Sequence, residues 1–132
     1  MELIRLEYQI GKENITKIKN TSVLVIGLGG VGGYAVESLI RSGIENIILV
    51  DADIIEKSNI NRQIIALQST IGMKKVDAFE NRILDINPNC SVETFSCFYD
   101  EKTTDLIFNK DYDYILDCCD SLKSKELSSL YP

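Results

Sequence analysis

A glycine-rich segment covers residues 27–33 and follows directly on a run of apolar, mostly β-branched residues. It carries the spacing G-x-G-x-x-G at Gly27, Gly29 and Gly32, with Gly30 inside it. Between a strand and a helix, the first glycine permits a tight turn, the second lets a phosphate approach the backbone, and the third lets the helix pack close to the sheet. The phosphate then lies at the helix N-terminus, whose free N–H groups favour an anion. The segment therefore predicts a nucleotide-binding loop.

An acidic residue stands where the ribose of a nucleotide would lie. Asp51 follows Gly32 by 19 residues and comes directly after a second apolar run, 47–50. A carboxylate at the end of the second strand of such a unit accepts hydrogen bonds from ribose hydroxyls and disfavours a 2′-phosphate. The glycine loop and this acid together leave NAD, FAD, S-adenosylmethionine and ATP open as ligands.

The composition excludes several kinds of chemistry. The chain has 132 residues, enough for one domain, and contains no His, so histidine-based catalysis and histidine–metal sites are excluded within it. Its formal net charge of −6 argues against a non-specific nucleic-acid binder. Its four cysteines form no C-x-x-C pair, and we expect buried, reduced thiols, with no thioester role for Cys118 or Cys119. No apolar stretch approaches the roughly 20 residues that cross a bilayer, so we expect a cytoplasmic protein without a membrane partner.

Alternating strand and helix patterns must position these residues. Residues 1–20 predict a helical lead-in that Gly11 divides in two, and residues 21–132 predict one nucleotide-binding domain. Continuous apolar runs bounded by turn residues are typical of strands buried on both faces of a parallel sheet. We expect strands at 23–26, 46–50, 92–97 and 112–116, helices at 31–42, 74–86 and 101–109, and a loop with a short helix at 54–72. This alternation predicts the α/β class, with a Rossmann-like, doubly wound parallel sheet.

Further blocks along the chain carry a resemblance to one family. They are, in order, GLGGVGG at 27–33, DAD at 51–53, SNINRQ at 58–63, GMKKV at 72–76, INP at 86–88 and DCCDS at 117–121. In order and spacing they resemble the adenylating superfamily of the ubiquitin-activating enzymes, the sulfur-carrier activators ThiF and MoeB, and the tRNA threonylcarbamoyladenosine dehydratases, TcdA. The segments NRQI at 61–64, AL at 66–67 and RLEYQIG at 5–11 look most like the dehydratase branch. Family members are commonly much longer, so the resemblance covers the N-terminal half only and the fold is truncated.

The resemblance implies that ATP binds in place of a dinucleotide and that a substrate carboxylate attacks its α-phosphate, giving an acyl-adenylate and pyrophosphate. It implies that Asp51 binds the ribose, with Asp53 in the same nucleotide-binding block. It also implies that Asn59 contacts the triphosphate, although a loop-capping role for this side chain stays open.

An adenylation transition state requires positive charge. The resemblance assigns this charge to Arg62 and Lys75, with Lys74 as a competing candidate for the role of Lys75. It implies that Asp120 holds Mg²⁺, for which a carboxylate oxygen is a suitable hard donor. Arg5 aligns with an arginine that family dimers extend to the ATP of the partner subunit, which implies a homodimer. Each of these residues also has a plain alternative, such as a solvated helix face, surface charge or a turn at a strand end.

The two branches of the resemblance imply different substrates. The dehydratase branch implies activation of the threonylcarbamoyl carboxylate on adenosine 37 of a tRNA, followed by closure to a cyclic form. The sulfur-carrier branch implies adenylation of the C-terminal glycine of a ubiquitin-like protein, in some members with a cysteine desulfurase as a further partner. A catalytically incomplete fragment that binds nucleotide or only dimerises is a third possibility, and an NAD oxidoreductase is a weaker fourth. We expect an ATP-dependent adenylating enzyme with the tRNA as its substrate.

Overall fold

The computed structural model describes residues 2–107 and 111–119. Two short helices open the chain, and strands and helices alternate after them. The elements are α1 (Ile4–Ile10), α2 (Lys12–Asn20), β1 (Ser22–Ile26), α3 (Gly30–Arg41), β2 (Asn46–Val50), the 3₁₀ turn η1 (Lys57–Asn59), α4 (Lys75–Ile86), β3 (Ser91–Phe95), α5 (Thr104–Ile107) and β4 (Tyr114–Asp117). The division into a lead-in, 1–20, and a nucleotide-binding domain, 21–132, stays a prediction.

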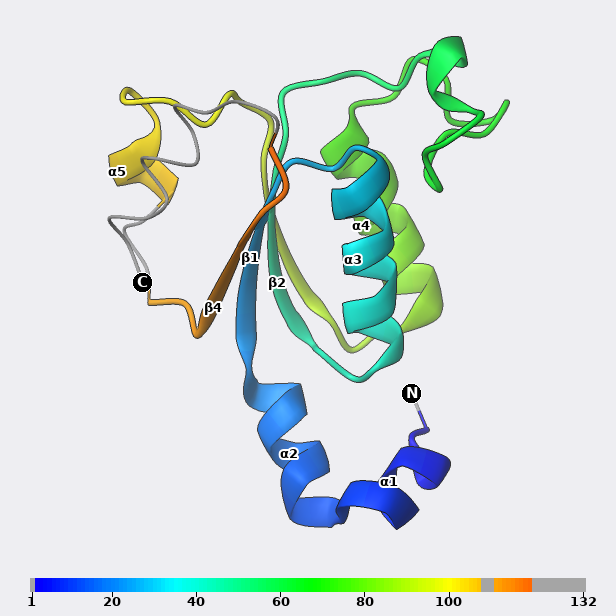
Figure 1. Cartoon of the computed structure of the whole chain (residues 1–132), viewed down its shortest axis with the longest axis vertical. Helices are drawn as coiled ribbons and strands as arrows, with labels where there is room; N and C mark the ends of the chain where they lie inside the picture. Colours follow the sequence, from blue (N-terminus) through cyan, green and yellow to red (C-terminus); the bar gives the residue numbers. More distant parts are fainter. Residues whose placement is uncertain (1, 108–110, 120–132) are drawn as a thin grey trace.

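The four strands form one parallel sheet in the order β3-β2-β1-β4 (Figure 1). In the register of β1, Ile26 at its end pairs with Val50 of β2 on one side and with Asp117 of β4 on the other. The chain proceeds from β1 to β3 in one direction and then returns to the opposite side of β1 with β4. In open parallel sheets, ligands bind at the carboxyl ends of the strands beside such a reversal.

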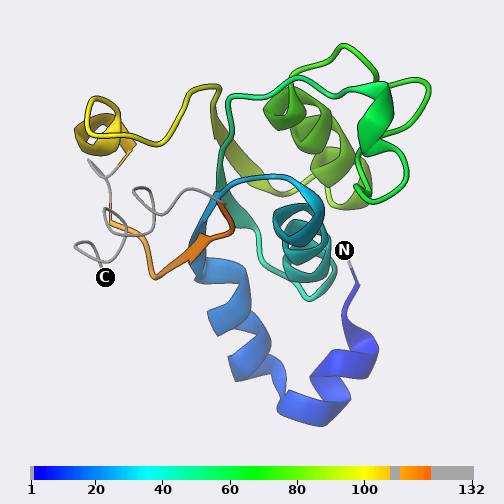
Figure 2. The same ribbon diagram turned by 45° about the horizontal axis from the view of Figure 1, so that its top comes forward.

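Side chains of β1 and β2 are buried on both faces of the sheet. Odd-numbered positions belong to the core shared with α3 and α4: Val23, Val25, Ile47 and Leu49. Even-numbered positions belong to a second core with Tyr99 and Ile107: Leu24, Ile26, Ile48 and Val50. Figures 1 and 2 show α3 and α4 on one face of the sheet and α5 on the other. Because successive side chains of a strand point to opposite faces, such a strand is apolar throughout, and the predicted doubly wound parallel sheet is confirmed.

The predicted helix 101–109 is wrong at its start, because α5 begins only at Thr104. The preceding residues form a turn around Asp100, whose Oδ1 accepts hydrogen bonds from the N–H groups of Lys102 (2.9 Å) and Thr103 (3.1 Å). Side chains such as Asp and Thr compete in this way with regular helical hydrogen bonding. Residues 108–110 lie outside the described part of the chain.

The third and fourth strands are displaced from their predicted ranges. β3 ends at Phe95 rather than at residue 97, and β4 covers Tyr114–Asp117 rather than 112–116. Tyr112 precedes the paired residues of β4, and its hydroxyl donates a 2.6 Å hydrogen bond to the carbonyl of Ile107. The other predicted elements agree with the structure to within a residue or so at each end.

The first two helices lie at the amino ends of the strands, below β1 in Figure 1. Gly11 separates them with a φ of 85°, so the predicted break is confirmed. Ile15 of α2 is buried, while Arg5 of α1 is exposed. Within residues 2–107 and 111–119, no helix combines the length and hydropathy that spanning a bilayer would require.

Candidate functional site

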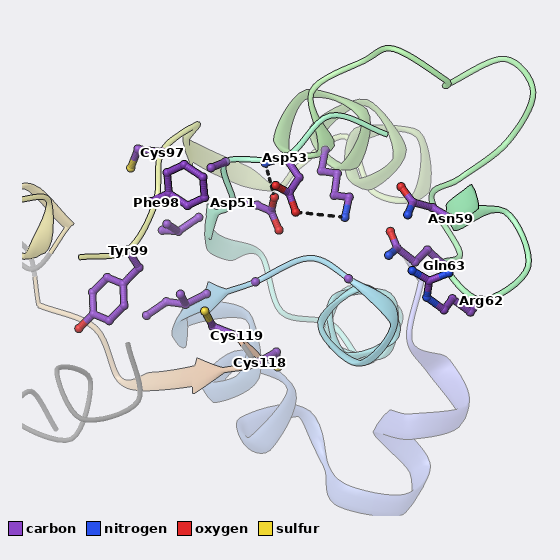
Figure 3. Close-up of a pocket in the computed structure, with 16 residues that line it drawn as sticks. Asp51, Asp53, Asn59, Arg62, Gln63, Cys97, Phe98, Tyr99, Cys118 and Cys119 are labelled. Carbon is purple, nitrogen blue, oxygen red and sulfur yellow. Dashed lines mark hydrogen bonds and ion pairs between the residues drawn. The ribbon is translucent and has the colours of Figure 1, made fainter. Parts of the chain in front are cut away.

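A cavity of ≈ 450 Å³ lies at the carboxyl edge of the sheet. Residues at or just beyond the ends of β1, β2 and β4 contribute to its lining: Ile26, Gly27, Val50, Asp51, Cys118 and Cys119. Figure 3 shows the cavity with Asn59, Arg62 and Gln63 on one side, Cys97, Phe98 and Tyr99 on the other, and Asp51 and Asp53 between them. The cavity therefore occupies the place where a doubly wound sheet binds its ligand.

The loop between β1 and α3 requires glycine at two positions. Gly27 has a φ of 91°, and a Cβ there would come within 2.9 Å of the backbone of Cys118. A Cβ on Gly32 would overlap the carbonyl oxygen of Gly27, so the first turn of α3 packs directly on the loop. Gly29 lines the cavity and has space in front of it, because the nearest atom to a Cβ there would be Nε2 of Gln63 at 3.8 Å. The loop thus presents an open surface at the N-terminus of α3, where helices favour anions.

Asp51 ties the glycine loop to the end of β2. Its Oδ2 accepts a 2.7 Å hydrogen bond from the N–H of Leu28, and its Oδ1 accepts a 2.7 Å bond from the N–H of Asp53. The carboxylate is partly buried and lines the cavity. Each of its oxygens has a further lone pair that can accept from a hydroxyl. Its position suits the predicted ribose contact, which stays a prediction.

Lys75 places a buried cation in the cavity wall. Its side chain is 6% exposed, and its Nζ lies 3.8 Å from Oδ2 of Asp53. The backbone holds the two residues together, because the N–H of Lys75 donates to the carbonyl of Asp53 (3.0 Å) where α4 begins. Lys74 is exposed and forms a β-bridge with Ile54. Of the two candidate lysines, Lys75 is therefore the one that lines the cavity.

The turn after β2 brings Asn59 and Arg62 to the same cavity. Asn59 is buried, and its Oδ1 accepts a 2.9 Å hydrogen bond from the N–H of Glu56. Arg62 is exposed, and its Nη1 donates to the carbonyl of Ser58 (2.9 Å) and to Oδ1 of Asn61 (3.2 Å). Asn59 thus has the capping role left open above while it also lines the cavity. The guanidinium of Arg62 has only neutral, exposed partners among these bonds, so an anion can replace them.

Gln63 is a site residue that sequence reasoning missed. The residue is 8% exposed, lines the cavity, and its Oε1 has no hydrogen-bond partner within the described residues. Figure 3 shows its amide directed into the cavity. A buried polar atom without a partner is costly and marks a place where a ligand or water is expected to bind. The available signal was its position directly after Arg62 in the SNINRQ block.

The opposite wall is apolar and sulfur-containing. Phe98 is 72% exposed, whereas the neighbouring Tyr99 is buried in the second core. Burial raises the pKa of the Cys97 thiol, and the carboxylate of Asp100 raises it further. A thiol whose pKa is raised is a poor nucleophile at neutral pH. The expectation of buried thiols is confirmed for Cys90 but is wrong for Cys97, Cys118 and Cys119, which are partly exposed.

Among the predicted site residues that the structure describes, Gly30 and Gly32 belong to the loop and helix behind the cavity rather than to its lining, and Arg5 is far from it. Arg5 belongs to α1, which lies at the opposite end of the sheet (Figure 1). There Arg5 lines a separate groove together with Arg41. Asp120 lies outside the described residues, so its role as a Mg²⁺ ligand stays a prediction. Within the described ranges, no three His, Cys, Asp or Glu side chains come together as a metal site.

The INP block has a structural role. Asn87, which is 1% exposed, follows α4, and its Nδ2 donates a 2.9 Å hydrogen bond to Oε2 of Glu45. Its Oδ1 accepts from the N–H of Asn89 (3.1 Å). The backbone carbonyl of Glu45 accepts from the N–H of Ser91 (2.7 Å). The asparagine therefore joins the entry to β2 to the turn before β3, away from the cavity.

The chain is similar in sequence and in fold to known proteins. The chain is 47% identical over 118 residues to the tRNA threonylcarbamoyladenosine dehydratase of Bacillus subtilis, which covers 89% of this chain and 46% of that protein. It is 36% identical to the adenylyltransferase and sulfurtransferase MOCS3 of Drosophila yakuba, over 90% of this chain and 26% of that protein. The crystal structure of Escherichia coli tRNA N6-threonylcarbamoyladenosine dehydratase, TcdA, in complex with ATP superposes with a TM-score of 0.88 at 33% identity, over 92% of this chain and 50% of that chain.

The chain thus spans about half the length of the dehydratases that it matches, as the resemblance to an N-terminal half predicted. The ThiF family model matches residues 3–129, which is nearly the whole sequence and includes every residue discussed above as part of the site. With the glycine loop, the doubly wound sheet and its relatives in agreement, the chain belongs to the ThiF family.

Proposed function

We propose that this chain is the ATP-binding, adenylating part of a tRNA threonylcarbamoyladenosine dehydratase. The proposal rests on one observation. Three segments that are separate in sequence bring the glycine loop, Asp51 and Lys75 to the same cavity. The high identity to the Bacillus subtilis dehydratase and the ATP bound to the Escherichia coli relative support the choice of ligand and branch.

Different kinds of side chain line the two sides of the cavity, and this difference orients the nucleotide. Asn59, Arg62 and Gln63 lie on one side of the cavity (Figure 3), and Lys75, paired with Asp53, also lines it. Their amides and cations suit the triphosphate. Asp51 lies between this side and the aromatic side, so its carboxylate is placed for the ribose hydroxyls. Gly29 leaves room for a phosphate at the N-terminus of α3.

The proposed reaction is displacement at the α-phosphate. An oxygen of the threonylcarbamoyl carboxylate forms a bond to phosphorus, and the bond from phosphorus to the bridging oxygen of the β-phosphate breaks, releasing pyrophosphate. The attack increases negative charge on the phosphate oxygens, which the cations of Lys75 and Arg62 stabilise. No histidine or enzyme thiolate is needed for this step. The amide side of the same substituent then attacks the activated carbonyl carbon and closes the ring, which displaces AMP and releases one proton to solvent.

A bound Mg²⁺ would neutralise part of the negative charge on the phosphates. The cavity suits such an ion, because the carboxylate of Asp53 is 64% exposed, lines the cavity and offers hard oxygen donors. Asp120 is the proposed additional ligand. The remaining site residues act on the nucleotide directly.

We also place Arg5 in the partner's cavity of a homodimer, since α1 lies too far from its own cavity at the other end of the sheet. Mixing Arg5→Ala and Lys75→Met chains tests this arrangement. A mixed dimer has one cavity with both residues intact, so activity should rise above that of either variant alone. Equal activity before and after mixing would rule out the exchange of Arg5 between subunits.

Calorimetric titration of Mg-ATP and of NAD into the purified chain, with an Arg62→Ala variant alongside, tests nucleotide binding. We expect ATP to bind, the variant to bind it more weakly, and NAD to give no signal. ATP–pyrophosphate exchange with and without tRNA that carries threonylcarbamoyladenosine then tests the reaction. Binding of ATP without exchange would identify a catalytically incomplete nucleotide-binding fragment, and binding of neither nucleotide would contradict the proposal.

The 36% identity to MOCS3 supports a second candidate, adenylation of a ubiquitin-like sulfur carrier at its C-terminal glycine, with a cysteine desulfurase as a further partner. Both candidates adenylate a carboxylate in the same cavity. The exchange assay separates them when the tRNA is replaced by a ubiquitin-like carrier ending in glycine. Stimulation by the carrier alone would favour the second candidate.

A further inference from the structure

Phe98 is a large apolar side chain that projects into solvent at the cavity. It is 72% exposed although it lines the cavity, and Figure 3 shows it on the side opposite Asn59 and Gln63. The phosphate-binding roles proposed above leave this side of the cavity without a function. An aromatic face beside a nucleotide site is suited to stacking on a nucleobase.

The segment around Phe98 is held in place from both sides. The hydroxyl of Thr103 donates a 2.6 Å hydrogen bond to the carbonyl of Phe98 and accepts a 3.0 Å bond from the N–H of Asp100. Tyr99 is 6% exposed and belongs to the second core, together with Ile107 of α5. The ring of Phe98 is therefore presented by a braced turn, with its neighbour buried beneath the sheet edge.

The order of the side chains along the cavity favours a nucleobase at this position. The carboxylate of Asp51, suited to a ribose, lies between Phe98 and the amides and cations of the other side (Figure 3). A nucleotide whose phosphates lie at Gln63 and whose ribose lies at Asp51 extends its base toward Phe98. A purine has a larger face than a pyrimidine, so stacking there selects for purine nucleotides.

From these observations we infer that Phe98 is a specificity-determining residue that stacks on the purine base of the bound nucleotide. The inference rests on the proposed function for its ligand, ATP, and adds the residue that selects its base. A purine could come from free nucleotide or from an RNA strand, and the inference commits to the free nucleotide. The reason for this choice is the order of groups along the cavity, in which Phe98 is followed by Asp51, proposed for the ribose, and then by the amides and cations proposed for the phosphates.

The experiment compares the affinities of ATP, CTP and inorganic tripolyphosphate for the full chain and its variants by calorimetry. Phe98→Ala should weaken ATP binding about fivefold or more, since stacking on one aromatic contributes about 1–3 kcal/mol and 1.4 kcal/mol is tenfold. The same variant should leave tripolyphosphate affinity unchanged and reduce the ratio of ATP to CTP affinity. Phe98→Tyr should retain ATP binding.

Tyr34→Ala is the matched control, because Tyr34 is 55% exposed on α3 and does not line the cavity. It should leave all three affinities unchanged. Thermal unfolding of each variant identifies any that lose the fold, and Phe98→Leu, which keeps apolar volume but no ring, then replaces Phe98→Ala with the same expected loss of ATP affinity.

Three results would overturn the inference. One is ATP binding by Phe98→Ala that equals wild type, and another is an equal loss of ATP and tripolyphosphate affinity. The third comes from a parallel titration with a short adenosine oligoribonucleotide: a loss of affinity confined to that ligand would place an RNA base on the ring instead. Failure of the wild-type chain to bind ATP overturns the proposed function as well, so the two failures are distinguishable.

Discussion

Nζ of Lys75 lies 3.8 Å from Oδ2 of Asp53, although the lysine side chain is 6% exposed and the aspartate side chain is 64% exposed. This distance is longer than a hydrogen bond. The pair joins a buried cation at the start of α4 to a carboxylate at the edge of the cavity, marked by a dashed line in Figure 3. Such a loose ion pair holds the ammonium near the cavity while leaving it able to bind a phosphate.

Replacement of Lys75 by Met should weaken ATP binding about tenfold or more, because a hydrogen bond to a charged group contributes about 1.5–3 kcal/mol. The variant keeps the length and most of the packing of the side chain, so its thermal stability should stay close to that of wild type. Lys74→Met is the control and should leave ATP affinity unchanged, since Lys74 is exposed outside the cavity. Equal effects of the two substitutions in calorimetry would show that the phosphates do not contact Lys75.

Gln63→Leu should stabilise the free protein while it weakens nucleotide binding. The substitution removes the buried Oε1 that has no partner among the described residues, and relief of an unsatisfied polar group is favourable by about 1 kcal/mol. It also removes the amide that faces the cavity, so ATP affinity should fall. Chemical denaturation and calorimetry on the same preparation measure both changes. A loss of stability without a loss of affinity would assign Gln63 to the fold rather than to the ligand.

Two glycines of the loop should respond differently to alanine. Gly32→Ala places a methyl group on the carbonyl of Gly27, so the loop and α3 must separate and the chain should lose several kcal/mol of stability, about 3 or more. Gly29→Ala meets no atom closer than 3.8 Å, so the variant should fold, but its methyl group occupies the space proposed for a phosphate. Circular dichroism and ATP titration of both variants test this. A folded Gly29→Ala chain with wild-type affinity would move the phosphate elsewhere.

Glu37 joins α3 to α4, because its carboxylate accepts bonds from Nε (2.7 Å) and Nη2 (3.1 Å) of Arg82 and from Nε of Arg41 (2.7 Å). The hydrogen bonds from Arg82 lower the pKa of Glu37 below its usual 4.5, more than burial raises it. A lowered pKa in the folded state stabilises the protein above the unfolded pKa, and this contribution is lost as the pH falls through the folded pKa. Glu37→Gln should therefore cost about 1–2 kcal/mol at pH 7 and less as the pH falls below 4.5.

Urea unfolding of Glu37→Gln at a series of pH values from 7 to below the pKa checks this prediction. Arg41→Gln is its control, because the side chain of Arg41 is 59% exposed and its i,i+4 bond to Glu37 contributes only about 0.5 kcal/mol. A cost for Glu37→Gln that does not change with pH would mean that packing, and not the charge of Glu37, stabilises this contact.

The sheet could be predicted from the sequence because its signal is repeated. Val23 to Ile26 and Ile47 to Val50 are apolar at every position, which only burial on both faces explains, and the glycine loop between them requires a turn. The start of α5 could not be predicted, because the apolar pattern after residue 100 does not show that Asp100 and Thr103 form a hydrogen-bonded turn instead.

Prediction of the site depended on motifs rather than on periodicity. Asp51 and Arg62 lie in recognisable blocks, and both line the cavity. Gln63 stands in a loop without periodic pattern, and its burial follows only from packing against the glycine loop. The sequence does not distinguish Phe98 from the other aromatic residues of the chain. Only the three-dimensional structure shows that it is exposed and lies opposite Gln63.

The order of the strands also bears on when the cavity can form. β1 and β2, which pair, are separated in sequence only by the glycine loop and α3, whereas the contact from Ser22 N–H to the carboxylate of Asp113 joins residues 91 positions apart. Contacts that are distant in sequence carry a larger loop-closure cost and form slowly. During synthesis, the glycine loop and Asp51 leave the ribosome long before β4, whose following residues complete the cavity wall. A nascent chain should therefore gain affinity for nucleotide only once β4 has docked beside β1, and ATP present at that moment would favour the completed sheet.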